Sequence, residues 1–238
     1  MSGHSKWSTI KRKKGKTDAE RGKMFSKLVR EIILATKQGG GPDLTMNSRL
    51  RLAVQKAKDA NMPNDNVSRA IQKGSGDGAD SNLEEIVYEA YAPFGVGLLI
   101  ETLSDNKNRT LPNIKSVLNK YGSSLATKGA VSYNFEQKGY FIFEPGISEE
   151  EVMEVATMAD AEDIDIKDDG SVEVITEPKN FEQVRKAFEE NNLNFISAEI
   201  TMLPKTFVTL TDEQSEKVMN IINKLEDDDD VQNVYTNS

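Results

Sequence analysis

"TFVTLTDEQSEKVMNIINKLEDDDDVQNVYT" (residues 206–236) constrains the arrangement of the whole chain. It predicts a helix from about Asp212 to Leu225, followed by a strand at "VQNVYT" (231–236). The segment is too short to bury a core alone, because domains below ~40 residues usually need disulfides, metals or oligomerisation. The sequence has no cysteine to supply a disulfide. We therefore expect this segment to pair with a sheet formed earlier in the chain.

The sheet that it would complete is predicted between residues 83 and 136. "EIVYEAYAP" (85–93) and "GVGLLIETL" (95–103) are typical of strands, and "AVSYNF" (130–135) predicts another. A helix is expected from about Arg109 to Tyr121, and no second strand–helix–strand half follows it within this segment. We therefore predict a discontinuous α+β domain made of residues 83–136 and 204–238.

Residues 137–203 predict a second α+β domain, inserted into the first. Its expected elements run strand, helix, strand, strand, helix, strand over Tyr140–Glu144, Glu149–Ala159, Asp163–Lys167, Ser171–Thr176, Phe181–Asn191 and Phe195–Met202. This βαββαβ order matches the ferredoxin-like arrangement. The predicted fold class is α+β multidomain: an N-terminal three-helix domain (residues 1–76), followed by two ferredoxin-like α+β domains, one inserted in the other.

The first 76 residues predict three amphipathic helices that share a small core. The spacing of Thr17 and Glu20 predicts a capping box at the start of the first helix, and "GGGP" (39–42) ends it. A second helix is expected from about Ser48 to Ala60, and Gly74 is expected to cap the C-terminus of a short third helix. The apolar positions recur every three or four residues: Phe25, Leu28, Val29, Ile32, Leu50, Ala53, Val54, Ala57, Val67, Ala70 and Ile71.

Positive charge is concentrated near the N-terminus. Residues 1–73 hold 17 Lys/Arg and 6 Asp/Glu, a net charge of +11, whereas the remaining residues hold 13 and 33, a net charge of −20. This asymmetry is typical of an acidic body that carries a basic module for a polyanion. The candidate nucleic-acid contacts are Lys6, Trp7, Lys11, Arg12, Lys13, Lys14, Lys16, Arg21, Lys23, Lys27 and Arg30.

Trp7 has two open interpretations. Its ring could pack on the first helix, or it could stack on a base or a sugar of a bound nucleic acid. The cations around it would neutralise phosphates and release counterions, but phosphate contacts do not read sequence. Because no segment matches a recognition helix, the cations alone do not distinguish duplex DNA from structured RNA.

The sequence marks no other kind of site. His4 is the only histidine and there is no cysteine, so neither a Ser/His/Asp set nor a thiolate metal site is indicated. "GKT" (15–17) lacks the first P-loop glycine, and "EDIDIKDDG" (162–170) and "EDDDD" (226–230) are interpreted as solvated turns. We expect no enzymatic activity, metal, cofactor or small-molecule substrate. Without a membrane-spanning run or a secretory signal, we expect a cytoplasmic protein.

Three segments carry a family resemblance: "GHSKWSTIKRKKGKTDAERGKMFSKLVREI" (3–32), "NSRLRLAVQKAKDANMPNDNVSRAIQKG" (47–74) and "LSDNKNRT" (103–110). With them the chain resembles, over essentially its whole length, the YebC/PmpR family, which includes the mitochondrial translational activator of cytochrome oxidase. The resemblance implies a helical domain followed by two α+β domains, one inserted in the other. It also implies a probable DNA-binding transcriptional regulator, or a translation factor that binds ribosomal or transfer RNA and relieves stalling at proline-rich stretches. No enzymatic activity is attributed to the family.

The chain departs from the family pattern at two places. Where the family usually has "YEGYGPGGV", it reads "YEAYAPFGV" (88–96), with Ala90, Ala92 and Phe94 in place of glycines. "GSSLATKGAVSYNF" (122–135) also differs from a glycine-rich, Trp-containing version. Contacts that those glycines make through a close backbone approach are therefore in question here.

Two further interpretations stay open. "SDNKNRT" (104–110) precedes a helix, and its Asp and Asn content favours a helix-capping turn over a second nucleic-acid contact. A protein–protein adaptor, docking a basic partner on the acidic surface, is the alternative from another functional class. An adaptor role would leave the cationic N-terminal arm, residues 5–16, unexplained.

Overall fold

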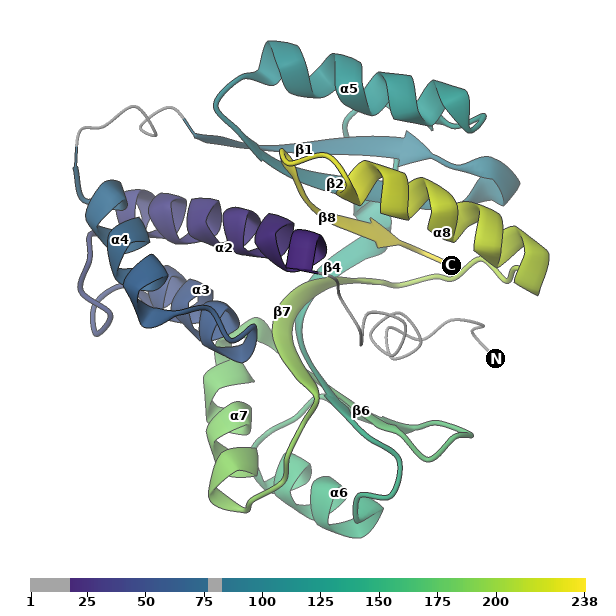
Figure 1. Ribbon diagram of the computed structural model, residues 1–238. Coiled ribbons are helices and arrows are strands. Elements are labelled where there is room, and N and C mark those ends of the chain that lie inside the picture. The colour runs from purple at the N-terminus through teal and green to yellow at the C-terminus, as the bar shows by residue number, and fades with distance from the viewer. Residues whose placement is uncertain (1–17, 77–82) are drawn as a thin grey trace.

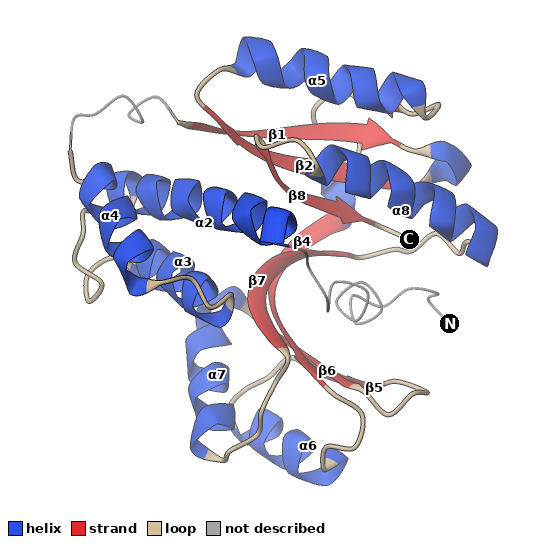
Figure 2. Cartoon of the chain, in the orientation of Figure 1, coloured by secondary structure: helices blue, strands red, loops and turns tan. Residues whose placement is uncertain are grey.

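The computed structural model describes residues 18–76 and 83–238, which form seven α-helices and two four-stranded sheets (Figures 1 and 2). The first three helices lie beside the upper sheet of Figure 1, and the second sheet extends below them. All strand pairs in both sheets are antiparallel. The predicted α+β class is confirmed.

Three helices, α2 (Asp18–Gln38), α3 (Ser48–Asp59) and α4 (Asn64–Gly74), form the N-terminal unit. After α2 the chain turns at Gly40 and Gly41, whose φ angles of +100° and +104° suit glycine. Thr17, expected to cap α2, lies outside the described residues. The shared core consists of Ile32, Ile33, Ala35, Leu50, Ala53, Val54, Ala57, Met62, Val67 and Ala70.

Gly74 has a different role from the predicted one. It is the last residue of α4, and Ser75 is the C-cap. A Cβ atom at Gly74 would lie 2.7 Å from both the carbonyl oxygen of Ile33 and the Cβ of Thr36. The absence of a side chain therefore lets α4 pack closely on α2, which is a tertiary requirement that helix-end rules do not reveal.

The upper sheet contains β1 (Glu84–Tyr91), β2 (Gly97–Ser104), the two-residue β3 (Ser124–Leu125) and β8 (Val231–Thr236), in the order β3-β1-β2-β8. Leu99 of β2 lies opposite Tyr235 of β8, so the C-terminal segment pairs with this sheet. Helices α5 (Lys107–Lys120) and α8 (Asp212–Glu226) cover one face (Figure 1). The core between them includes Leu98, Ile100, Ile114, Leu118, Val218, Ile221, Ile222 and Leu225.

The lower sheet is formed by residues 135–204. It contains β4 (Phe135–Phe143), β5 (Asp163–Ile166), β6 (Val172–Thr176) and β7 (Ser197–Pro204), in the order β5-β6-β4-β7. Helices α6 (Glu149–Met158) and α7 (Phe181–Glu190) pack on one face only. Aromatic rings fill that core: Phe141 stacks on Phe181 at 4.9 Å between centroids, and Phe188 meets Phe141 edge-on at 5.3 Å.

The prediction of a strand at "AVSYNF" (130–135) is wrong. Residues 132–134 form a 3₁₀ turn, and β4 begins only at Phe135. The cause is Glu89 of β1, whose buried carboxylate accepts the backbone N–H groups of Gly129, Val131 and Ser132 at 2.7, 2.6 and 2.9 Å. These donors bind a side chain, so they cannot form a strand ladder.

The substituted glycines have two different outcomes. Ala90 and Ala92 are buried in the core of the upper sheet, where their methyl groups are accommodated. Phe94 adopts φ +69° and ψ +17°, a left-handed conformation that favours glycine. Its side chain is 42% exposed. The turn between β1 and β2 therefore keeps a glycine-type backbone although the residue is phenylalanine.

The Glu89 carboxylate should make a measurable contribution to stability. Replacing Glu89 by Gln puts an amide nitrogen where an oxygen accepts N–H bonds. It should lower the free energy of unfolding by about 2–3 kcal/mol near neutral pH. Urea unfolding measures the difference. Glu84→Gln, a change at an exposed β1 carboxylate, is the control and should change it by less than about 0.5 kcal/mol.

The same variant has a pH dependence of known sign. Burial alone would raise the pKa of the Glu89 carboxyl, but the three N–H donors outweigh it and hold that pKa below the ordinary value of 4.5. Glu89 therefore stabilises the fold above its unfolded pKa and loses that effect as the pH falls through its folded pKa. The difference in free energy of unfolding between Glu89→Gln and the parent protein should become smaller at acidic pH. A difference that does not change with pH would contradict this assignment.

Candidate nucleic-acid interface

Only part of the predicted contact set lies in the described chain. Lys6, Trp7, Lys11, Arg12, Lys13, Lys14 and Lys16 lie outside it. Arg21, Lys23, Lys27 and Arg30 lie on α2. The contacts of Lys23, Lys27 and Arg30 lie within the protein.

Lys23, Lys27 and Arg30 form a basic ridge on α2, because spacings of four and three residues place them on one helix face. The ridge contacts the acidic turn, residues 226–230, which joins α8 to β8. Lys27 Nζ donates to the carbonyl oxygen of Glu226 at 2.7 Å. This contact brings the middle of α2 to the end of α8.

The other two ridge cations contact carboxylates of the acidic turn. Lys23 Nζ lies 3.6 Å from Oδ1 of Asp227, with about half of each side chain exposed. Arg30 Nη1 donates to the carbonyl oxygen of Asp229 at 2.6 Å and to Oδ1 of Asp230 at 3.1 Å. The contact between Arg30 and Asp230 is stronger than the one between Lys23 and Asp227, because the Asp230 side chain is only 3% exposed.

Asp230 receives donors from three separate elements. Besides Arg30, its Oδ2 accepts from Arg109 Nη2 at 2.8 Å, from Thr110 Oγ1 at 2.8 Å and from Ser104 Oγ at 3.0 Å. Burial would raise the pKa of the Asp230 carboxyl, but these donors outweigh it and hold the pKa below its ordinary value of 3.8. The prediction that "EDDDD" is simply a solvated turn is therefore wrong at Asp230.

The "SDNKNRT" segment is a capping turn that also supplies this network. The Asn106 side chain accepts the backbone N–H groups of Asn108 and Arg109 at 3.1 and 3.2 Å, at the start of α5. Ser104, Arg109 and Thr110 are hydrogen-bonded to Asp230. The capping interpretation is confirmed, and Ser104, Arg109 and Thr110 of the segment are engaged within the protein.

The cations of the basic ridge are therefore already in contact with the acidic turn and are not free to bind phosphate without competition. In this arrangement a phosphate would compete with Asp227 for Lys23 and with Asp230 for Arg30. The role of the ridge in nucleic-acid binding stays a prediction. It has the added condition that phosphate binds the exposed part of these side chains or displaces the acidic turn.

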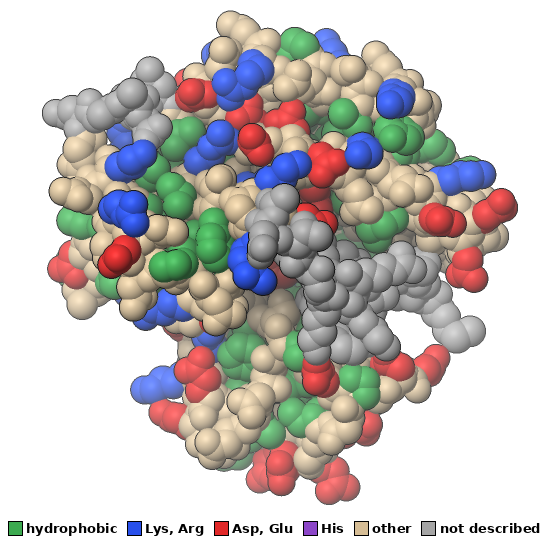
Figure 3. All heavy atoms as spheres, in the orientation of Figure 1, with side chains coloured by type: hydrophobic (Ala, Val, Ile, Leu, Met, Phe, Trp, Pro, Cys, Tyr) green, Lys and Arg blue, Asp and Glu red, His purple; other side chains and the backbone are tan. Residues whose placement is uncertain are grey.

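On α3 and α4, three exposed cations outside the predicted set form no ion pair within the described residues. For Arg51 and Lys58 of α3 and Arg69 of α4, no carboxylate of residues 18–76 or 83–238 forms an ion pair. Arg51 and Lys58 are seven residues apart, so they share one face of α3. Figure 3 shows Lys and Arg side chains spread over the helical unit, whereas Asp and Glu predominate below, around α6 and α7. These three cations could have been identified from the sequence, because they lie at positions of the predicted helices that face away from the apolar stripe.

Two further observations concern clusters of possible metal ligands and long apolar helices. No group of three His, Cys, Asp or Glu side chains in the described part of the chain is placed to hold a metal ion. In the 162–170 segment, Lys167 pairs with Asp165 and, at 2.9 Å, with Glu173. None of the helices that the structure describes combines the length and hydropathy of a bilayer-spanning segment.

The Asp230 network predicts a large and specific loss of stability. Asp230→Asn removes the charge that balances Arg30 and Arg109, and it should lower the free energy of unfolding by about 3 kcal/mol or more. Asp229→Asn is the matched control: its side chain is exposed and only its carbonyl contacts Arg30, so it should change stability by less than about 0.5 kcal/mol. Equal effects in urea unfolding would show that the acidic turn acts only through net charge.

Comparison with known proteins covers both parts of the chain. Residues 5–77 match the model of the TACO1/YebC N-terminal domain, and residues 83–238 match the model of the TACO1/YebC second and third domains. Proteins of Syntrophotalea carbinolica and Syntrophus aciditrophicus are each 48% identical over 100% of this chain and 95% of their own length. Both are named probable transcriptional regulatory protein.

A solved structure supports the same relationship. The crystal structure of a conserved hypothetical protein from Aquifex aeolicus has a TM-score of 0.85 and 43% sequence identity, covering 98% of this chain and 96% of that one. The similarity therefore extends through the helical unit and both sheets. The chain belongs to the TACO1/YebC family.

Proposed function

We propose that this protein is a non-enzymatic regulator that binds nucleic acid, with DNA as its target in transcriptional regulation. The observation that carries the proposal is the gathering of 17 Lys/Arg in residues 1–73 of a chain whose net charge is −9. The names of the relatives at 48% identity support the same role. An adaptor function would not need this cationic segment.

The N-terminal arm supplies the main phosphate contacts. Lys6, Lys11, Arg12, Lys13, Lys14 and Lys16 lie within twelve residues that contain no carboxylate. Each cation that neutralises a phosphate releases a counterion, which gives affinity without sequence preference. The acidic remainder repels phosphate and so favours approach through the N-terminal unit.

The described cations extend this surface. Arg51, Lys58 and Arg69 are exposed and have no ionic partner in the part of the chain that the structure describes. They suit contacts to the backbone of a nucleic acid that the arm has already captured. The basic ridge contributes less, because Arg30 is already paired with the buried carboxylate of Asp230.

The arm assignment predicts a change in salt dependence. Replacing Lys11, Arg12, Lys13 and Lys14 by Gln should weaken binding and reduce the slope of log K against log salt by about 3, at ~0.7–0.9 per lost contact. Gel shifts across a salt series measure it. Gln at Lys107, Lys115, Lys179 and Lys217, four exposed lysines of the acidic body, is the charge-matched control. The arm assignment fails if both variants shift the slope equally.

A second candidate function has one observation in its favour. Apart from Trp7, every residue of the predicted contact set is Lys or Arg, and these contact phosphates that RNA and DNA share. Binding to ribosomal or transfer RNA on the ribosome, as a translation factor, is therefore the alternative.

Two measurements separate the candidates. For a transcriptional regulator, gel shifts should show a preference for particular duplex sequences over scrambled DNA at matched salt, and the protein should stay at the top of a sucrose gradient. For a translation factor, DNA binding should lack that preference and the protein should sediment with ribosomes until salt releases it. Sedimentation with ribosomes without sequence preference on DNA would overturn the transcriptional role.

A further inference from the structure

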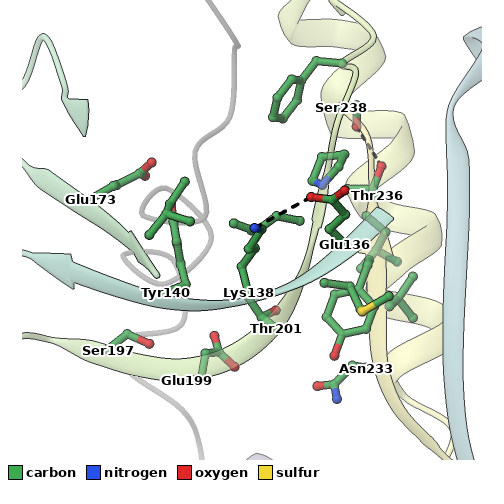
Figure 4. Close-up of a pocket in the computed structure, with 18 of the residues that line it drawn as sticks. Glu136, Lys138, Tyr140, Glu173, Ser197, Glu199, Thr201, Asn233, Thr236 and Ser238 are labelled. Atoms are coloured by element: carbon green, nitrogen blue, oxygen red, sulfur yellow. Dashed lines mark hydrogen bonds and ion pairs between the residues drawn. The ribbon is translucent and has the colours of Figure 1, made fainter. Parts of the chain in front are cut away.

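An acidic groove separates the two sheet units (Figure 4). It has a volume of about 670 Å³, and one wall is the face of the lower sheet that α6 and α7 leave uncovered. The other wall comes from α8 and from the end of β8. Seven carboxylates but only three lysines line it, so the groove has a negative balance.

Glu173 gives an independent indication that a donor belongs in this groove. Its side chain is only 7% exposed, and Lys167 Nζ lies 2.9 Å from one carboxylate oxygen. The other oxygen, Oε1, is buried and has no hydrogen-bond partner among the described residues. Figure 4 shows Glu173 beside Tyr140 at one end of the groove. A buried carboxylate oxygen without a donor is unfavourable, so a cationic or N–H donor would satisfy it.

We propose that the groove binds a cationic peptide segment, and that its occupant is residues 5–16 of the same chain. This segment contains six Lys/Arg and no Asp or Glu, which complements the acidic lining. Trp7 and Ile10 of the segment match apolar side chains that also line the groove, including Met202, Phe207 and Met219. Phe207 is 58% exposed, so it offers a ring surface for them.

The position of α2 puts this segment within reach. Lys27 contacts the carbonyl of Glu226, which itself lines the groove, and Lys23 contacts Asp227 one residue further on. The helix begins at Asp18, about 8 Å along its axis from Lys23. Twelve extended residues span up to ~40 Å, which is enough to run the length of the groove.

The inference rests on the proposed function for its consequence. The cations of residues 5–16 cannot bind the groove and a phosphate polymer at once, so the groove competes with nucleic acid for the arm. The apparent affinity for nucleic acid is then the intrinsic affinity multiplied by the fraction of molecules whose arm is free. If about nine-tenths of the arms are bound, emptying the groove would tighten nucleic-acid binding about tenfold.

Distance measurements on the full chain test the location of the arm. The protein has no cysteine, so Ser8→Cys with Ser197→Cys carries two spin labels, one in the arm and one in the groove. We expect a short, narrow distance distribution that lengthens when duplex DNA or structured RNA is added. A broad, long distribution without nucleic acid would overturn the inference. Short distances in a mixture of singly labelled chains would assign the groove to a second copy's arm and also overturn it.

Charge changes test whether the groove competes. Asp163→Asn with Glu199→Gln neutralises two groove carboxylates, and it should lengthen the label distance and tighten nucleic-acid binding about three- to tenfold. Glu154→Gln with Glu182→Gln, on α6 and α7 over the opposite face, changes the net charge equally and should do neither. Circular dichroism checks that both variants are folded. Equal tightening by both pairs would show a general charge effect and reject the groove.

The two proposals fail separately. If the labels are close and the groove variant separates them, the groove assignment holds even when neither DNA nor RNA binds, and only the proposed function fails. If nucleic acid binds through the arm while the labels stay far apart, only the groove assignment fails.

Discussion

The buried carboxylate of Asp230 fixes how the helical unit is placed against the upper sheet. A charge removed from water is tolerated only when it is paired and hydrogen-bonded, and Asp230 meets both conditions with Arg30, Arg109, Thr110 and Ser104. These donors come from α2, the end of β2 and the start of α5, whereas the acceptor lies just before β8. The helical unit is thereby held against the sheet that the C-terminal segment completes.

This constraint gives the acidic turn two roles. Asp230 is structural, because removing one partner of a buried ion pair destabilises a protein by about 3–5 kcal/mol. Asp227 is largely exposed, and a pair such as Asp227 with Lys23 contributes only about 0–1 kcal/mol. The same turn therefore holds Arg30 firmly and Lys23 weakly. It also places the start of α2 beside a groove whose lining is acidic.

The sequence predicted those features that local patterns determine. The end of α2 at Gln38 and the capping turn at residues 104–110 follow from glycine and Asp/Asn preferences, and hydrophobic periodicity places most helices and strands. Features set by distant partners were missed. Nothing near residues 130–135 indicates that Glu89 takes their N–H groups, and nothing in "EDDDD" indicates that its last residue is buried under Arg109. For the candidate site, composition located the basic segment, but it could not show that the basic ridge already has an acidic partner.

A cationic segment in an acidic protein can pair with the protein's own carboxylates, and the arrangement of charges in this chain determines which of those pairs a polyanion can replace. Free arm cations would pair with any nearby carboxylate, and exposed pairs are weak and screened by salt. A polyanion offers many phosphates at once and gains entropy from released counterions, so it can displace such pairs. It cannot displace Arg30 as easily, because that would leave the Asp230 carboxylate buried with one guanidinium fewer. The chain thus separates cations that hold the fold from cations that can exchange partners, and only the second kind can serve regulation by nucleic acid.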